Sequence, residues 1–424
     1  MSEIQNVGNT DIDLREALLK FISDFSSWEL SSDNRYLNVS RQLIKCAHES
    51  RPYVVDPFAG GGSIPLEALR LDCEAFSSDL NPVAGLIQKV VLQDVPKHKS
   101  ALADKLEQSG KILQELLEKE LRDIYPLDLD GSQPIAYLWA RTVRCESINC
   151  GAEIPIYRSA WLSKRANSRA KYFKEDPKGK FVALLIDKAP IGGPITFRIA
   201  RGNGSEEAKP GYENLSVTKV PGNNANVLCP CCKSILPGNR TNPRTVIQLF
   251  QQAGGAEVLF NENGERIGGA TLLAVVTTNR NERGRTYRLA TTKDYAAIWR
   301  AQELLGKSNK AFIPNESLPP IGTSGFRVQR YGMLHWGDLF ATRQKIVISF
   351  LAEQMISPSI DDEVRNILAL CISKMVDMNN NLATWQPHAE IPAHMLTRFA
   401  IPMKWDFAES VPLSESSGTL RTSI

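Results

Sequence analysis

The chain has 424 residues, of which 42% are hydrophobic and 23% are charged, and its formal net charge is +3. This composition is that of a globular protein with two or three domains and an ample core. No apolar run approaches the ~20 residues that a bilayer-crossing helix needs, and the polar N-terminus lacks the pattern of a signal peptide, so we expect a cytoplasmic protein. Because the net charge is close to zero, any binding of nucleic acid would have to come from local basic patches.

Two helices are predicted before the first strand. Residues 13–25 carry apolar side chains at helical spacing, and residues 39–49 form a second such segment. We interpret both as packing elements.

A strand, a glycine turn and a helix follow in residues 51–71. Residues 53–55 are an apolar run that favours a strand. The backbone of Gly60 to Gly62 can adopt conformations closed to other residues and can lie directly against a ligand. Ser63 is predicted to cap the helix over residues 64–71.

A second predicted strand, residues 74–78, ends on Asp79, 23 residues after Asp56. In a doubly wound sheet, an acid at this strand tip can hold the ribose hydroxyls of a nucleoside. Gly62 is followed by Ser63-Ile64 rather than by the Lys-Ser/Thr of NTPase phosphate loops, and Pro65 stands where a dinucleotide loop needs a small residue. Asp56 also directs a negative charge into the turn, which suits an amine better than a pyrophosphate.

S-adenosylmethionine (SAM) fits these features, because it has a cationic amino-acid tail, a ribose and no phosphate. The alternative is a glycine-rich turn without a ligand. Asn81 is most simply interpreted as the cap of a helix that runs to about residue 91, and a contact with the ligand is the second interpretation. A long polar helix is predicted over residues 99–125. The candidate cofactor-binding residues are Asp56, Pro57, Phe58, Gly60, Gly62, Asp79 and Asn81.

Two cysteine pairs follow a predicted strand over residues 135–144. Cys145 and Cys150 form the first pair, and Cys229 and Cys232 the second, with 78 residues between the pairs. Two such pairs on tight turns are typical of a zinc ribbon with a closed, structural four-cysteine site for Zn²⁺. The long gap requires an insertion within the ribbon, Cys231 is interpreted as a bystander, and four unrelated thiols are the alternative.

Basic residues with interleaved aromatics fill part of this gap. Such a segment attracts phosphates and can stack on bases, although a solvated basic face explains it equally well. A second basic patch lies between predicted strands at residues 271–278 and 286–290. The candidate nucleic-acid contacts are Lys164, Arg165, Arg169, Lys171, Arg283 and Arg285.

Further helices are predicted from Asp338 through residue 355 and over residues 361–378. The five histidines are scattered singly, and no Ser/His/Asp or Cys/His set stands out. We therefore assign no catalytic residue.

Several segments together resemble one family. They are Val-Val-Asp-Pro-Phe-Ala-Gly-Gly-Gly at 54–62, Ser-Asp-Leu-Asn-Pro at 78–82, and the segments 134–142 and 325–333. This combination resembles the large prokaryotic adenine-specific DNA methylases that contain a zinc ribbon, some of which occur beside anti-phage genes. The resemblance runs from about Leu14 to Glu409 and covers the middle of those longer proteins.

The resemblance implies a Rossmann-like, SAM-dependent methyltransferase sheet of the α/β class that is incomplete here, with an inserted β-rich zinc ribbon and C-terminal helices. The family's catalytic Asp/Asn-Pro-Pro-Tyr/Phe motif accepts the hydrogens of the target amine and stacks on a flipped base. In this chain the only Pro-Pro is Pro319-Pro320, between Leu318 and Ile321. The segment Trp405 to Glu409 matches a stretch that precedes the motif in the family.

We therefore expect a methyltransferase module for exocyclic amines of DNA bases, adenine first, that is a truncated product or one half of a split enzyme. Its partners would be DNA and a separate chain that carries the catalytic half. The alternatives are a non-catalytic nucleic-acid-binding subunit and an RNA base methyltransferase. The predicted domains are a cofactor half (1–130), a zinc ribbon with a basic insertion (131–240), a β-rich basic region (241–335) and a helical region (336–424).

Overall fold

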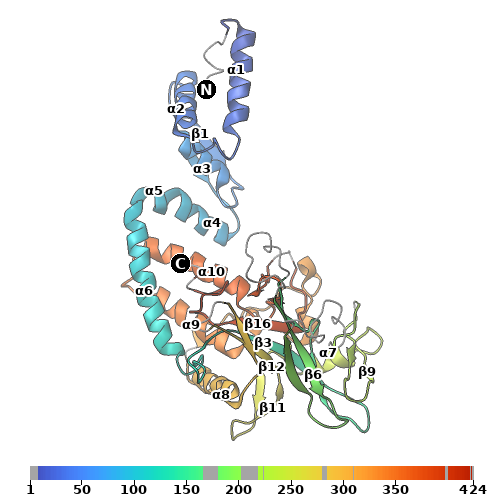
Figure 1. Cartoon of the computed structure of the whole chain (residues 1–424). Coiled ribbons are helices and arrows are strands. Elements are labelled where there is room, and N and C mark those ends of the chain that lie inside the picture. The colour runs from blue at the N-terminus through green and yellow to red at the C-terminus, as the bar shows by residue number, and fades with distance from the viewer. Residues whose placement is uncertain are drawn as a thin grey trace. The chain divides into compact units, whose positions relative to one another are not determined.

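The protein is described from a computed structural model, in which residues 8–165, 180–201, 218–222, 224–278, 284–308, 310–396, 400–420 and 422 are described. The chain is of mixed α/β class and forms two compact units (Figure 1). The first comprises Met1–Lys105 with Asp362–Leu370, and the second comprises Leu106–Asp361 with Cys371–Ile424. The predicted domain boundaries stay predictions.

The first unit begins with two helices that pack through aromatic rings. They are α1 (Asp11–Phe25), which starts two residues before the predicted segment, and α2 (Asn34–Ala47), which starts five residues earlier and ends two residues earlier than predicted. Phe21 stacks on Tyr36 with ring centroids 5.2 Å apart, and Phe25 lies against both rings. Asp33 caps α2 by accepting the backbone N–H of Arg35, which explains why the helix starts before residue 39.

A parallel pair of strands follows. Strand β1 (Tyr53–Asp56) pairs with β2 (Glu74–Ser77), so that Val55 lies beside Phe76. Helix α3 (Ser63–Arg70) connects them. The prediction that Ser63 caps α3 is wrong: the capping position is Gly62, whose φ of +83° lies in the left-handed region that glycine adopts without a steric penalty.

The remaining helical segments of the first part of the chain are α4 (Pro82–Lys89), a π-helical turn (Val90–Asp94), α5 (Val95–His98) and α6 (Ser100–Leu121). Asn81 caps α4, as predicted, by accepting the backbone N–H of Val83. Among the described residues, no helix is long and apolar enough to span a membrane.

The second unit is built around one long strand. Strand β3 (Gln133–Arg144) is buried over its whole interior and lies in an antiparallel sheet of order β13-β12-β3-β16, with β4 (Glu153–Ile156) also paired to it (Figure 1). The neighbours are β12 (Thr271–Thr278), β13 (Thr286–Arg288) and β16 (Asp406–Ser410). Side chains of β3 and β12 form one core with those of β6 (Lys180–Lys188). Because β3 is buried on both faces, its sequence is an almost continuous run of apolar residues.

Shorter elements complete this unit. The remaining strands are β5 (Trp161–Arg165), β7 (Thr196–Arg201), β8 (Val227–Leu228), β9 (Ile235–Leu236), β10 (Val258–Phe260), β11 (Arg266–Gly269), β14 (Trp385–Gln386) and β15 (Ile391–Pro392). The helices are α7 (Arg244–Phe250), α8 (Thr292–Lys307) and α9 (Thr342–Met355), together with the part of α10 (Asp362–Met378) from Cys371 onward.

The predicted start of helix α9 at Asp338 is wrong. Residues Trp336–Leu339 form a 3-10 turn, in which the Asp338 carboxylate accepts the backbone N–H groups of Leu334 and His335. The carboxylate therefore closes its own turn, and α9 begins at Thr342.

A fully buried ion pair ties this unit together. Arg343 donates from Nε and Nη2 to the two carboxylate oxygens of Glu409 at 2.8 and 2.7 Å. The same carboxylate accepts the Tyr125 hydroxyl at 2.7 Å and the Trp139 indole N–H at 2.8 Å. The guanidinium also lies 4.1 Å from the ring centroid of Tyr137. Although burial by itself lowers it, the pKa of Arg343 is raised overall, chiefly by the charge of Glu409.

The replacement Glu409→Gln should strongly destabilise the second unit, because it leaves the Arg343 charge buried without its counter-ion. We expect the free energy of unfolding to fall by about 3–5 kcal/mol, measured by urea denaturation followed by tryptophan fluorescence. The matched control is Glu107→Gln, which removes an exposed pair with Lys111 and should leave the free energy of unfolding almost unchanged. Equal effects of the two substitutions would contradict this account of the core.

Candidate functional site

The carboxylate of Asp79 closes the glycine loop between β1 and β2. It accepts the backbone N–H of Gly60 at 2.9 Å and that of Asn81 at 2.8 Å. These two bonds lower the pKa of Asp79, with the Asn81 bond the larger cause. The Ser78 N–H donates to the Asp56 carbonyl and the Ala59 N–H to the Ser78 carbonyl, so the tips of the two strands are adjacent. The structure therefore brings Asp56, Gly60 and Asp79 to one edge of the parallel pair.

The loop presents bare backbone to open space. Gly60 has a φ of +53°, and a Cβ added there would meet no atom within 4 Å. Its carbonyl accepts a hydrogen bond from the buried Gln88 side chain at 2.8 Å. At Gly62, by contrast, an added Cβ would lie 3.2 Å from Gln88. Gln88 thus fixes the loop from behind, while the face beside Gly60 is open to a ligand.

The other predicted cofactor residues lie around this loop. The Asp56 side chain accepts the Phe58 N–H at 3.2 Å, and the Phe58 ring is 88% exposed. Pro57 is exposed next to them. The side-chain oxygen of Asn81 is used in capping α4, as described above. A carboxylate at each strand tip and an open glycine backbone are groups that can bind a polar, cationic ligand.

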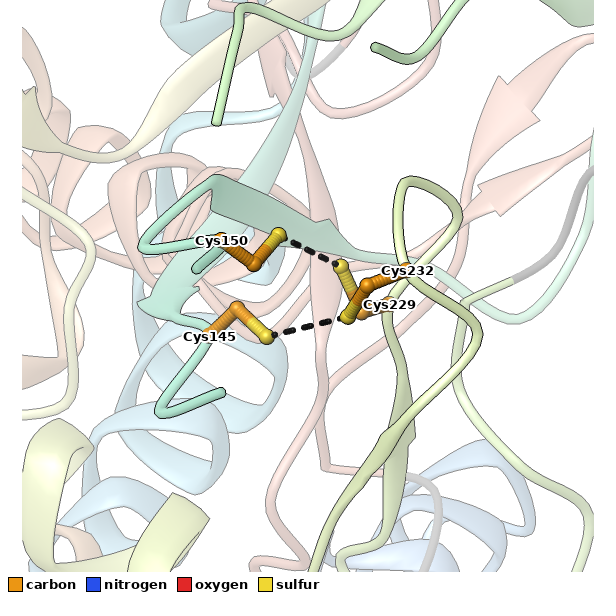
Figure 2. Close-up of side chains that lie close together, drawn as sticks. All are labelled: Cys145, Cys150, Cys229 and Cys232. Carbon is orange, nitrogen blue, oxygen red and sulfur yellow. Dashed lines mark hydrogen bonds between the residues drawn. The ribbon is translucent and has the colours of Figure 1, made fainter. Parts of the chain in front are cut away.

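A second site is formed by four cysteines. The thiols of Cys145, Cys150, Cys229 and Cys232 lie within 4.8 Å of one another (Figure 2). Cys145 Sγ is 3.6 Å from Cys232 Sγ, and Cys150 Sγ is 3.7 Å from Cys229 Sγ. Four sulfurs bound to one ion at about 2.3 Å in a tetrahedron are roughly 3.8 Å apart. The structure thus assembles the four predicted cysteines into a group that could hold a metal ion such as zinc.

Two turns present these thiols. Cys145 directly follows β3 and its N–H donates to Ala152, while the Cys150 N–H donates to Ser147. On the other side, the Cys229 N–H donates to Ser234 and the Lys233 N–H returns to Cys229. Lys233 has a φ of +64°, which reverses the chain tightly after Cys232. A three-stranded antiparallel sheet, β5-β6-β7, occupies part of the chain between the two pairs.

The surroundings of the thiols favour thiolates at two of them. The Ser234 hydroxyl, 2.7 Å from Cys232 Sγ, is the main cause that lowers the pKa of Cys232 to about 6. The backbone N–H of Gly192 lowers the pKa of Cys150, whereas burial raises the pKa of Cys145 and Cys229. A cation among the sulfurs would favour the thiolate at the latter two as well. Because all four positions are protein sulfurs, such a site leaves no ligand position for a substrate.

Three of the six predicted nucleic-acid contacts lie outside the described residues. Arg169, Lys171 and Arg283 are not described, and neither is the side chain of Arg165. The Lys164 ammonium lies 5.6 Å from the Trp161 ring centroid, and the Arg285 guanidinium lies 6.0 Å from that of Trp385. These contacts leave their predicted role untested.

Sequence reasoning missed Gln88 and Ser234, which support the two sites. Gln88 was a detectable exception, because it is a polar residue inside the apolar segment that became α4. The signal for Ser234 was its position two residues after the last cysteine. Neither interaction follows from helical or strand periodicity.

No family model matches this chain, and comparisons with curated proteins and with solved structures give no significant match.

The replacement Cys229→Ser should abolish metal binding, because it removes one of four converging sulfurs. We expect purified protein to contain about one metal ion per chain, measured by inductively coupled plasma mass spectrometry, and the Cys229→Ser variant to contain almost none. Cys231→Ser is the control, because Cys231 lies in the same turn but outside the group of four. Metal loss from the Cys231 variant with retention in the Cys229 variant would refute the assignment.

Proposed function

We propose that the chain is a SAM-binding methyltransferase module that acts on exocyclic amines of DNA bases, adenine first. The observation that carries the proposal is the pair of carboxylates, Asp56 and Asp79, at neighbouring strand tips across an open glycine loop. The chemistry of the ligand follows from the charges. A sulfonium and an ammonium favour a site with two carboxylates, whereas a pyrophosphate would be repelled by them.

Each acid would have a separate role in this site. Asp79 already accepts two backbone N–H groups, and its remaining lone pairs can accept ribose hydroxyls. Asp56 would attract the cationic end of the ligand. The exposed Phe58 ring would cover an apolar part of the nucleoside, and the open face of Gly60 would let the ligand lie against the backbone.

The exposure of the parallel pair supports a sheet that is completed by another polypeptide. Parallel strands are normally covered on both faces. Here Tyr53 and Val55 of β1 are 59% and 57% exposed, and Phe76, beside Val55, is 47% exposed. A separate chain with an Asp-Pro-Pro-Tyr motif would add strands to this Rossmann-like half and supply the groups that handle the base. The proposed action on DNA rests on the resemblance of the motifs and their order.

We assign the four cysteines to a structural zinc ribbon. A closed set of four thiolates supplies no catalytic water, and metal binding by such a set contributes directly to folding. The ribbon would therefore hold the end of β3 and the turn after β8 in place.

SAM binding tests the proposal directly. Asp79→Asn removes the charge but keeps an acceptor of similar size, and we expect it to weaken SAM binding at least tenfold in isothermal titration calorimetry, as for the loss of a hydrogen bond to a charged group. The matched control is Asp24→Asn, because Asp24 lies at the end of α1 and pairs with Lys20. If the wild-type chain binds no SAM, or if Asp79→Asn binds it as tightly as the control, the proposed cofactor site is refuted.

Methyl transfer is a separate measurement. The chain with a partner that carries the Asp-Pro-Pro-Tyr motif should transfer labelled methyl groups from SAM to duplex DNA, and Asp79→Asn should reduce this transfer. Labelling of structured RNA in preference to DNA would refute the DNA substrate while leaving the SAM site intact.

A further inference from the structure

A cation-lined cavity lies beside the metal group in the second unit. Its volume is about 380 Å³, and its wall includes Arg158, Lys219, Arg327, Tyr331 and Trp405. Trp405 also packs in the apolar cluster that contains the four cysteines, with Tyr331 against it. A cavity of this size accommodates a small ligand or one nucleotide of a longer chain.

The positive charge in this cavity is compensated only in part, by one buried acid outside the residues that line its wall. Among the described residues, no carboxylate lines the wall, and neither Arg158 nor Arg327 is within salt-bridge distance of one. Both arginines are exposed, so their guanidinium groups are available to a ligand. The buried acid Asp406 accepts the backbone N–H of Arg158 and also interacts with the charge of Arg158, although burial raises the pKa of Asp406 to about 6. Three cations thus face one cavity whose wall carries no described acid.

Lys219 is held in a fixed position. It is only 6% exposed, and its ammonium donates to the carbonyls of Val220 and Asn224. The ammonium also lies 5.6 Å from the Trp405 ring centroid. An ammonium has three N–H groups, and the two carbonyls accept two of them. Among the described contacts, the third N–H group can donate to an acceptor in the cavity. Burial is the main cause that lowers the pKa of Lys219, and the charge of Arg158 lowers it further. An anion nearby would raise this pKa again.

The cavity is suited to a phosphate rather than to a stacked base. Trp405 is 8% exposed, one face of its ring is near the Lys219 ammonium, and Tyr331 packs edge-on at 5.5 Å. No open aromatic face is therefore left at Trp405 for a base. Two forked guanidinium groups and an ammonium are the donors that bind phosphate oxygens best.

We propose that Arg158, Lys219 and Arg327 form a binding site for a backbone phosphodiester of DNA. The three cations come from widely separated parts of the chain: Arg158 follows β4, Lys219 precedes β8, and Arg327 precedes a 3-10 turn. The assignment rests on the proposed action on DNA. It adds a specific contact that would fix the register of the DNA on the second unit without reading its sequence.

The test is a salt titration of DNA binding. Fluorescence anisotropy with a labelled duplex should show about tenfold weaker binding for Arg158→Gln and for Arg327→Gln, and a log–log salt slope lowered by about 1 for each. Both side chains are exposed, so these variants should fold. The control Arg300→Gln removes an exposed arginine of α8 that does not line the cavity, and it should change neither quantity.

Three outcomes would overturn the proposal. The first is that the wild-type chain binds DNA and that the Arg158→Gln/Arg327→Gln double variant binds it with the same affinity and salt slope as the control Arg300→Gln. The second is a loss confined to inorganic phosphate or adenosine 5′-monophosphate in calorimetry, which would make the cavity a site for free phosphates. The third is a loss confined to labelled RNA.

The same experiment separates this site from the cofactor site. The double variant should bind SAM as the wild-type chain does. Absence of DNA binding by the wild-type chain would refute the phosphodiester site together with the DNA substrate, whereas absence of SAM binding alone would refute only the cofactor proposal.

Discussion

The carboxylate of Glu409 determines how the second unit is assembled. It joins α9 through Arg343, β3 through Trp139 and the end of the α6 region through Tyr125, while Glu409 itself lies on β16. A charge buried this deeply is tolerated only with a partner charge and satisfied hydrogen-bond positions. The network therefore accepts one arrangement of these elements and fixes β3 in the middle of the sheet.

Both sites of the second unit depend on the placement of β3. Cys145 follows its last residue, so the strand delivers the first sulfur of the metal group. The N–H of Arg141 on β3 donates to the carbonyl of Trp405, which places the indole beneath Lys219. Metal group and cation-lined cavity thus share β3 as a support, and both border the apolar cluster that contains Trp405.

The glycine loop of the first unit is supported differently. Its bonds join residues 19 and 28 positions apart, Asp79 to Gly60 and Gln88 to Gly60, within one strand–helix–strand–helix segment. The motif was recognisable in the sequence because its glycines, its two acids and the apolar runs before them stand at short, regular spacings along this segment.

The sequence by itself determined the strand–loop–helix around Asp56, the pairing of four cysteines in two turns and most helices, because these depend on local spacing and backbone preferences. It failed at Ser63, because Gly62 in a left-handed conformation takes the capping position, and at Asp338, because that carboxylate closes its own 3-10 turn. Only the tertiary structure decided that Arg158, Lys219 and Arg327 meet, and that Glu409 faces Arg343. Residues far apart in the chain become neighbours through the pairing of buried strands, and no local pattern records which strands pair.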